Sequence, residues 1–70
     1  MDSLKFLQMI VDAHLASNKT RIEETKELRK KADNDFSAGY WDGRVDGLFH
    51  EKVALEFIQG HLKKEAEKSA

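Results

Sequence analysis

The tripeptide Asp33-Asn34-Asp35 divides the 70-residue chain into two stretches that both have the composition of α-helices. Asp and Asn favour turns and helix N-caps because their short side chains hydrogen-bond to nearby backbone groups. The chain contains no proline, so no residue on either side is barred from a helix interior. We therefore predict an all-α fold, an antiparallel helical hairpin with helices over about residues 3–32 and 36–67 and a turn over 33–35.

The stretch before the turn carries its apolar residues on one helical face. Asp2 or Ser3 can cap its start. Successive residues of this face are three, four, four and seven positions apart, which is the spacing of a helix. They are Leu4, Leu7, Val11, Leu15 and Ile22.

A break inside the first helix is an open alternative. Ser17, Asn18 and Thr20 are cap-forming residues, and Thr20 with Glu23 has the spacing of a capping box. The neighbouring residues are compatible with a helix interior. The sequence therefore allows either one continuous helix or a kink near Asn18.

Three glycines recur at every fourth position early in the second helix, at Gly39, Gly43 and Gly47. A glycine inside a helix costs about 1 kcal/mol relative to alanine. This spacing places the three near one face, where a second helix could approach the backbone closely. In the alternative, Gly39 belongs to the turn and the helix starts near Tyr40 or Asp42.

Large apolar residues crowd the same segment and predict an interface or a partner-binding surface. They cover well over half of the helix circumference, whereas a surface helix has an apolar stripe of roughly 100°. One partner helix cannot bury this arc, and the register of the hairpin puts the charged residues 19–28 opposite it. The predicted surface consists of Phe36, Tyr40, Trp41, Val45, Leu48 and Phe49.

Chain length points to self-association. Chains this short usually need disulfides, a metal or oligomerisation for stability, and this chain has no cysteine. Its three histidines have no ligand spacing, so we expect no metal site. We therefore predict that the hairpin is a homo-oligomer, forming an oligomeric helical bundle.

Charge and hydropathy exclude several classes of partner. The 12 basic and 13 acidic residues nearly balance, which argues against nucleic-acid binding. No apolar run approaches the roughly 18 residues of a membrane span. Lys5, Gln8 and Asp12 interrupt the apolar N-terminal stretch, so it does not resemble a signal peptide. We expect a cytoplasmic protein without membrane contact.

No catalytic pattern stands out, and we predict that the protein is not an enzyme and needs no cofactor. Its carboxylates lack the sheltered surroundings that a general acid or base requires. The alternative chemistry is an anionic nucleotide held at a subunit interface, because guanidinium groups bind phosphate and aromatic rings stack on bases. The cations proposed for such a site are Arg29, Lys30 and Arg44.

The run from Gly39 to Leu48, Gly-Tyr-Trp-Asp-Gly-Arg-Val-Asp-Gly-Leu, resembles a segment of small helical-hairpin proteins of phages and prophages. In those proteins an aromatic-x-x-Gly-Arg-x-Asp-small-Leu segment opens a long amphipathic helix. The resemblance covers about 20 residues and implies an accessory product that binds and inhibits a host factor, or one that sequesters a nucleotide signal. It assigns no site residues.

Three functions follow as hypotheses. The leading one is a non-catalytic, oligomeric binding protein, phage-encoded as the resemblance implies, that binds and inhibits a host protein. The first alternative is a sponge for an anionic nucleotide signal. The second is a structural assembly module. Sequence leaves open whether the aromatic segment closes the oligomer or contacts the target.

Overall fold

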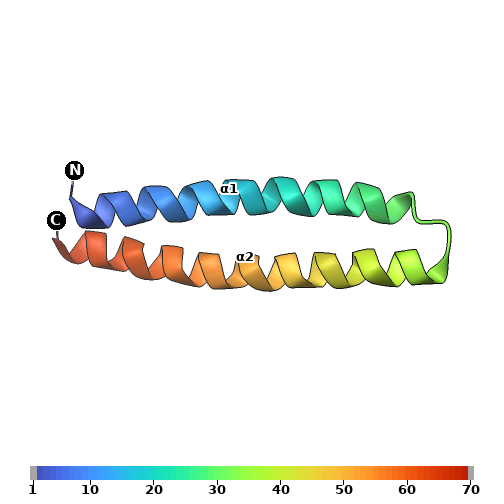
Figure 1. Ribbon diagram of the computed structural model, residues 1–70. Coiled ribbons are helices and arrows are strands. Elements are labelled where there is room, and N and C mark those ends of the chain that lie inside the picture. The colour runs from blue at the N-terminus through green and yellow to red at the C-terminus, as the bar shows by residue number, and fades with distance from the viewer. Residues whose placement is uncertain (1, 70) are drawn as a thin grey trace.

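The computed structural model describes residues 2–69 as two long helices packed side by side (Figure 1). Helix α1 spans Ser3–Lys30 and helix α2 spans Asp35–Ser69. They run antiparallel, so α1 begins at the end of the molecule where α2 finishes. The Cα trace measures 53 × 17 × 12 Å, which gives the hairpin two broad faces. The predicted all-α hairpin is confirmed.

Side-chain caps fix the starts of both helices. Asp2 Oδ1 accepts a hydrogen bond from the Lys5 backbone N–H at 2.8 Å, and Asn34 Oδ1 accepts one from the Ser37 N–H at 2.8 Å. Each bond satisfies a backbone donor that has no partner within the helix. Because Asn34 acts as a cap, α2 starts at Asp35, which the sequence analysis had placed in the turn.

The end of α1 tightens before the turn. The backbone N–H groups of Lys31 and Ala32 donate to carbonyl groups three residues earlier, at 3.2 Å each. Such bonds are typical of a final 3₁₀-like turn that closes a helix. The helix therefore ends at Lys30, two residues before the predicted boundary, and residues 31–34 form the connection.

Both open questions about helix continuity are answered by the structure. Helix α1 continues through Asn18 without a break. The Thr20 hydroxyl donates to the Ala16 carbonyl at 3.2 Å, so it bonds back into the helix and does not cap a new one. The early start of α2 places Gly39, Gly43 and Gly47 inside the helix, and the alternative start near Tyr40 is wrong.

The two helices meet along positions that alternate in spacing between three and four residues, as in an antiparallel coiled coil. On α1 the buried and half-buried positions of this interface are Leu4, Gln8, Val11, Leu15, Asn18, Ile22, Thr25 and Arg29. On α2 they are Trp41, Val45, Leu48, Lys52, Leu55, Leu62 and Ala66. Several of these side chains are polar, so the interface is a thin core.

Hydrogen bonds between the helices fix their register at three levels. Near the turn, the Arg29 guanidinium pairs with the Asp42 carboxylate at 2.8 Å. Midway, Asn18 Nδ2 donates to the Leu48 carbonyl at 3.0 Å, and farther out the Gln59 amide donates to Asp12 at 2.9 Å. Asn18 is 1% exposed, which makes a polar side chain the most deeply buried one of the described residues.

Candidate interaction surface

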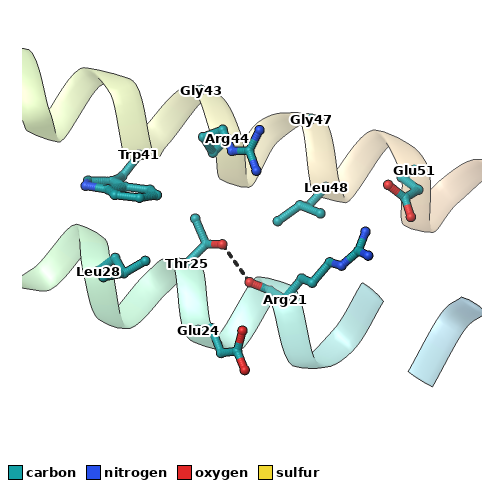
Figure 2. A pocket seen from close by; sticks show the side chains of 10 residues that line it. All are labelled: Arg21, Glu24, Thr25, Leu28, Trp41, Gly43, Arg44, Gly47, Leu48 and Glu51. Atoms are coloured by element: carbon teal, nitrogen blue, oxygen red, sulfur yellow. Dashed lines mark hydrogen bonds between the residues drawn. The ribbon is translucent and has the colours of Figure 1, made fainter. Parts of the chain in front are cut away.

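A cavity of about 570 Å³ opens between the helices on one broad face (Figure 2). Its floor is the interface near the turn, including Thr25, whose hydroxyl donates to the Arg21 carbonyl. A Cβ atom added at Gly43 or Gly47 would meet no atom within 4 Å, so the cavity is open above both glycines. We call this the charged cavity; its lining residues are Arg21, Glu24, Thr25, Leu28, Trp41, Gly43, Arg44, Gly47, Leu48 and Glu51.

Four charged side chains surround the charged cavity, two from each helix. Arg21 and Glu51 lie toward one end, and Glu24 and Arg44 lie nearer the other (Figure 2). All four are exposed, and within the described residues none of them forms an ion pair. The cavity therefore presents two positive and two negative groups that are free to bind a charged surface of matching pattern.

The structure separates the three cations proposed for an anionic ligand. Arg29 pairs with Asp42 at 2.8 Å and Lys30 pairs with Glu27 at 3.0 Å, both outside the charged cavity. Arg44 does line the cavity, where its cationic neighbour is Arg21. Arg21 was not among the predicted cations, although its position seven residues before Leu28 places the two side chains on one side of α1.

The aromatic segment of α2 divides between two environments. Trp41, Val45 and Leu48 are half-buried against α1, so they contribute to the hairpin itself. Phe36, by contrast, is 87% exposed and Tyr40 is also exposed. The interior of the hairpin therefore uses half of the predicted surface. Phe36 and Tyr40 remain exposed, although the Tyr40 ring packs edge-to-face against Trp41, with ring centroids 4.9 Å apart.

Phe49, the last member of the predicted segment, lies on the opposite broad face. The ammonium groups of Lys26 and Lys52 lie 5.2 and 5.8 Å from its ring centroid. Cations at this distance are attracted to the ring face. Lysine side chains thus cover Phe49 partly, which distinguishes it from Phe36.

A second exposed apolar surface lies farther along α2 than the predicted segment. We call it the outer patch; it is a shallow hollow lined by His50, Val53, Ala54, Phe57 and Ile58. Phe57 is 77% exposed and Val53 is exposed as well. Their spacing of four on one helix was the available signal, but the sequence did not show which side of α2 faces α1.

The two broad faces differ in chemistry. Opposite the charged cavity, the grooves beside the interface are lined mainly by charged and amide side chains. These include Asp12, Lys19, Glu23, Lys26, Lys52, Glu56, Gln59 and Lys63. We call this side the polar broad face. We call the side with the charged cavity the apolar broad face, because the exposed Leu7, Leu28 and Tyr40 lie on it beside the charges.

Other site chemistries receive no support from the described residues. Within residues 2–69, no group of three or more His, Asp or Glu side chains is placed to hold a metal ion. Over the same residues, neither helix has a segment with the length and hydropathy needed to cross a bilayer.

Comparisons with protein-family models, curated proteins and solved structures give no significant match.

Proposed function

We propose that this protein is a non-catalytic, oligomeric binding protein that inhibits a host protein by occupying one of its surfaces. One observation carries the proposal. Val11 and Ile22 are the buried hydrophobic residues among those the structure describes, whereas ten large hydrophobic side chains are exposed. Exposed apolar surface on this scale marks an interaction site.

The outer patch is the docking site in this proposal. It runs along one side of α2, where an amphipathic helix or a groove of the target could cover it. Burying Val53 and Phe57 would contribute roughly 1.5–3 kcal/mol each. That sum is a substantial part of the roughly 8 kcal/mol that a micromolar complex requires.

The resemblance to small phage and prophage proteins supports the choice of a host protein as target. Such a target would be found in a bacterial lysate. Inhibition by occlusion requires no catalytic group, because covering a surface needs only affinity and size.

A capture experiment with matched variants tests the proposal. Tagged wild-type protein is incubated with bacterial lysate, and bound proteins are identified by mass spectrometry. Phe57→Ser and Val53→Ser should lose a specific target that the wild type retains. Met9→Ser changes an exposed hydrophobic residue on α1 and should retain it. Equal capture by all variants would reject the outer patch as the docking site.

A nucleotide sponge is the second candidate, and the charged cavity favours it in one respect. Arg21, Arg44 and Trp41 line the same cavity, so cations and an aromatic ring are close together. Glu24 and Glu51 line it too and would repel a phosphate group. Thermal-shift measurements with cyclic and linear nucleotides decide: a shift that Arg44→Ala abolishes supports the sponge, and no shift rejects it.

A further inference from the structure

The apolar broad face continues along α1 well beyond the charged cavity. Arg21, Glu24 and Leu28 line the cavity at spacings of three and four residues. The same alternation carried toward the N-terminus reaches Ile10 and Leu7, because positions spaced in this way stay on one side of a helix. Leu7 and Leu28 are exposed, and Ile10 is half-exposed. On α1, Leu28 therefore lies next to the charged pair on one side, and Ile10 and Leu7 lie beyond the exposed Ser17 and His14 on the other.

Helix α2 repeats this arrangement. Arg44, Gly47 and Glu51 line the cavity at spacings of three and four. Carried in both directions, the alternation reaches Tyr40 near the turn and passes through Ala54 to Ile58, which also lines the outer patch. The side chains of Tyr40 and Ile58 are exposed. In both rows, apolar residues therefore lie on either side of the charged ones, and on α1 the polar His14 and Ser17 lie between Ile10 and Arg21.

The order of charges in the two rows is complementary. At one level α1 has Arg21 where α2 has Glu51, and at the next α1 has Glu24 where α2 has Arg44. A copy rotated by half a turn about an axis parallel to the helices would place its α2 over α1 at the same height. Arg21 would then face Glu51 of the copy, and Glu24 would face its Arg44.

Apolar residues also match in this arrangement. The Arg29–Asp42 pair puts Leu28 close to the level of Tyr40, so these two would meet across the copies. The bond between Asp12 and Gln59 likewise puts Ile10 close to the level of Ile58. The row of α2 also includes Gly47, whose missing side chain lets a facing helix approach closely.

An end-over-end arrangement, in which the turn of one copy lies over the chain ends of the other, does not match the charged and apolar residues in this way. If a fully overlapping copy is turned so that its turn lies over the chain ends, α1 faces α1 and α2 faces α2. Ile10 then lies near Glu24 of the copy, Arg44 lies near Ile58, and Glu51 lies near Glu51. Like charges and charges against apolar groups are unfavourable at an interface.

The size of the face is sufficient for a stable dimer. Its Cα dimensions of 53 by 17 Å give room for an interface of standard size, which buries about 800 Å² of accessible surface per partner. The polar broad face has the same dimensions, and the apolar residues that line its grooves are Leu15, Ile22 and Phe49, among a larger number of charged and amide residues.

We propose that a second copy of this chain docks on the apolar broad face, with both turns at the same end, to form a four-helix bundle. Its central contacts are the ion pairs Arg21–Glu51 and Glu24–Arg44 between copies. This inference rests on the oligomeric part of the proposed function and specifies its surface. The dimer leaves most of the outer patch exposed for the target.

Charge reversal in purified protein tests the pairs between copies. Arg21→Glu and Glu51→Arg should each weaken dimerisation about tenfold or more, because each reversal creates like-charge pairs across the two-fold axis. An equimolar mixture of the two variants should recover dimers that contain one chain of each. Native mass spectrometry identifies the mixed dimer, and sedimentation measures the affinities.

The mixture separates contacts between copies from contacts within one hairpin. A charge clash inside a single chain would persist after mixing, whereas a clash between copies is relieved. Lys19→Glu and Glu56→Lys make equivalent changes on the polar broad face and should dimerise like the wild type. Far-UV circular dichroism confirms that each variant is helical. Because no target is present, the result is independent of the capture experiment.

Resonance energy transfer tests the orientation. Donor and acceptor dyes on Lys31→Cys, in a chain without other cysteines, mark the turn. High transfer in the dimer supports turns at the same end, whereas the end-over-end arrangement would separate the dyes by about the 53 Å length of the hairpin. Four results would each overturn the proposal. They are a wild-type chain that is monomeric at micromolar concentration, single charge reversals that dimerise normally, a mixture of the two variants that does not recover dimers, and low energy transfer.

Discussion

The two broad faces of the hairpin are built from the same two helices, yet one is suited to burial and the other to water. On the apolar broad face, exposed Leu7, Leu28 and Tyr40 flank a group of four charges without ion pairs. On the polar broad face, lysine ammonium groups lie over Phe49, and charged and amide side chains outnumber the apolar ones that line its grooves. A coiled-coil pair with one apolar side has the pattern of half a four-helix bundle.

The interface beneath both faces is where a single change should have the largest effect. Ile22 is buried among the few hydrophobic side chains of the core. Ile22→Ala should lower the free energy of unfolding by about 2–4 kcal/mol, because it removes buried methyl groups and leaves a cavity. Urea titration followed by circular dichroism measures this loss. Met9→Ala, at an exposed position, should change stability by less than about 0.5 kcal/mol.

Much of this architecture could be predicted from the sequence. Asp33, Asn34 and Asp35 located the turn because such side chains favour local bonds to the backbone, as Asn34 makes to the Ser37 N–H. The apolar spacing identified the first helix. Whether Trp41, Val45 and Leu48 lie inside the hairpin or on its outer surface could not be predicted in the same way. Their large apolar side chains suit an interior and an outer surface equally, and only the packing of α1 on α2 decides between the two.

Asn18 shows a different limit of sequence reasoning. It has a cap-forming side chain, which raised the alternative of a break in the helix, but the structure buries it in the interface. Asn18 continues the three-and-four spacing of the interface positions on α1. A search for apolar residues alone does not include it, because its side chain is polar. Arg21 was missed for a related reason, since its role depends on the helix that lies across from it.

A matched pair of serine substitutions tests the difference between the faces directly. Leu28 is 43% exposed on the apolar broad face, and Phe49 is 37% exposed on the polar one. Leu28→Ser should weaken dimerisation by about tenfold or more, as expected for a residue that packs at an interface. Phe49→Ser should leave dimerisation unchanged. Analytical ultracentrifugation measures both, and equal effects would contradict the assignment of the faces.

Replacing Asn18 should stabilise the interface. Asn18 Oδ1 is buried and, in the described part of the chain, has no hydrogen-bond partner. Burial of such a group costs about 1–3 kcal/mol, so Asn18→Leu should raise the free energy of unfolding by about 1–2 kcal/mol. Polar residues in coiled-coil cores also fix register and oligomer state. Urea titration checks the stability, and sedimentation should detect oligomers of mixed size.

The smallest expected effect concerns glycines on opposite faces. Gly47→Ala and Gly60→Ala should each stabilise the isolated hairpin by about 1 kcal/mol, because both sites are helical and open. Gly47 lines the charged cavity, whereas Gly60 lies beside the polar broad face. Only Gly47→Ala should weaken dimerisation, since it adds a methyl group where the helices of two copies approach. Thermal unfolding and sedimentation of the same samples separate the two effects.

The short connection at residues 31–34 also has a consequence for the order in which the chain folds. The bonded pairs between the helices are separated by 13 residues at Arg29–Asp42, by 30 at Asn18–Leu48 and by 47 at Asp12–Gln59. The entropic cost of closing a loop rises with its length, so the pair nearest the turn forms most cheaply. Contacts between the helices should therefore form first next to Asn34 and then extend away from the turn. Backbone amide protons should exchange fastest at the open end, where the contacting residues are farthest apart in sequence.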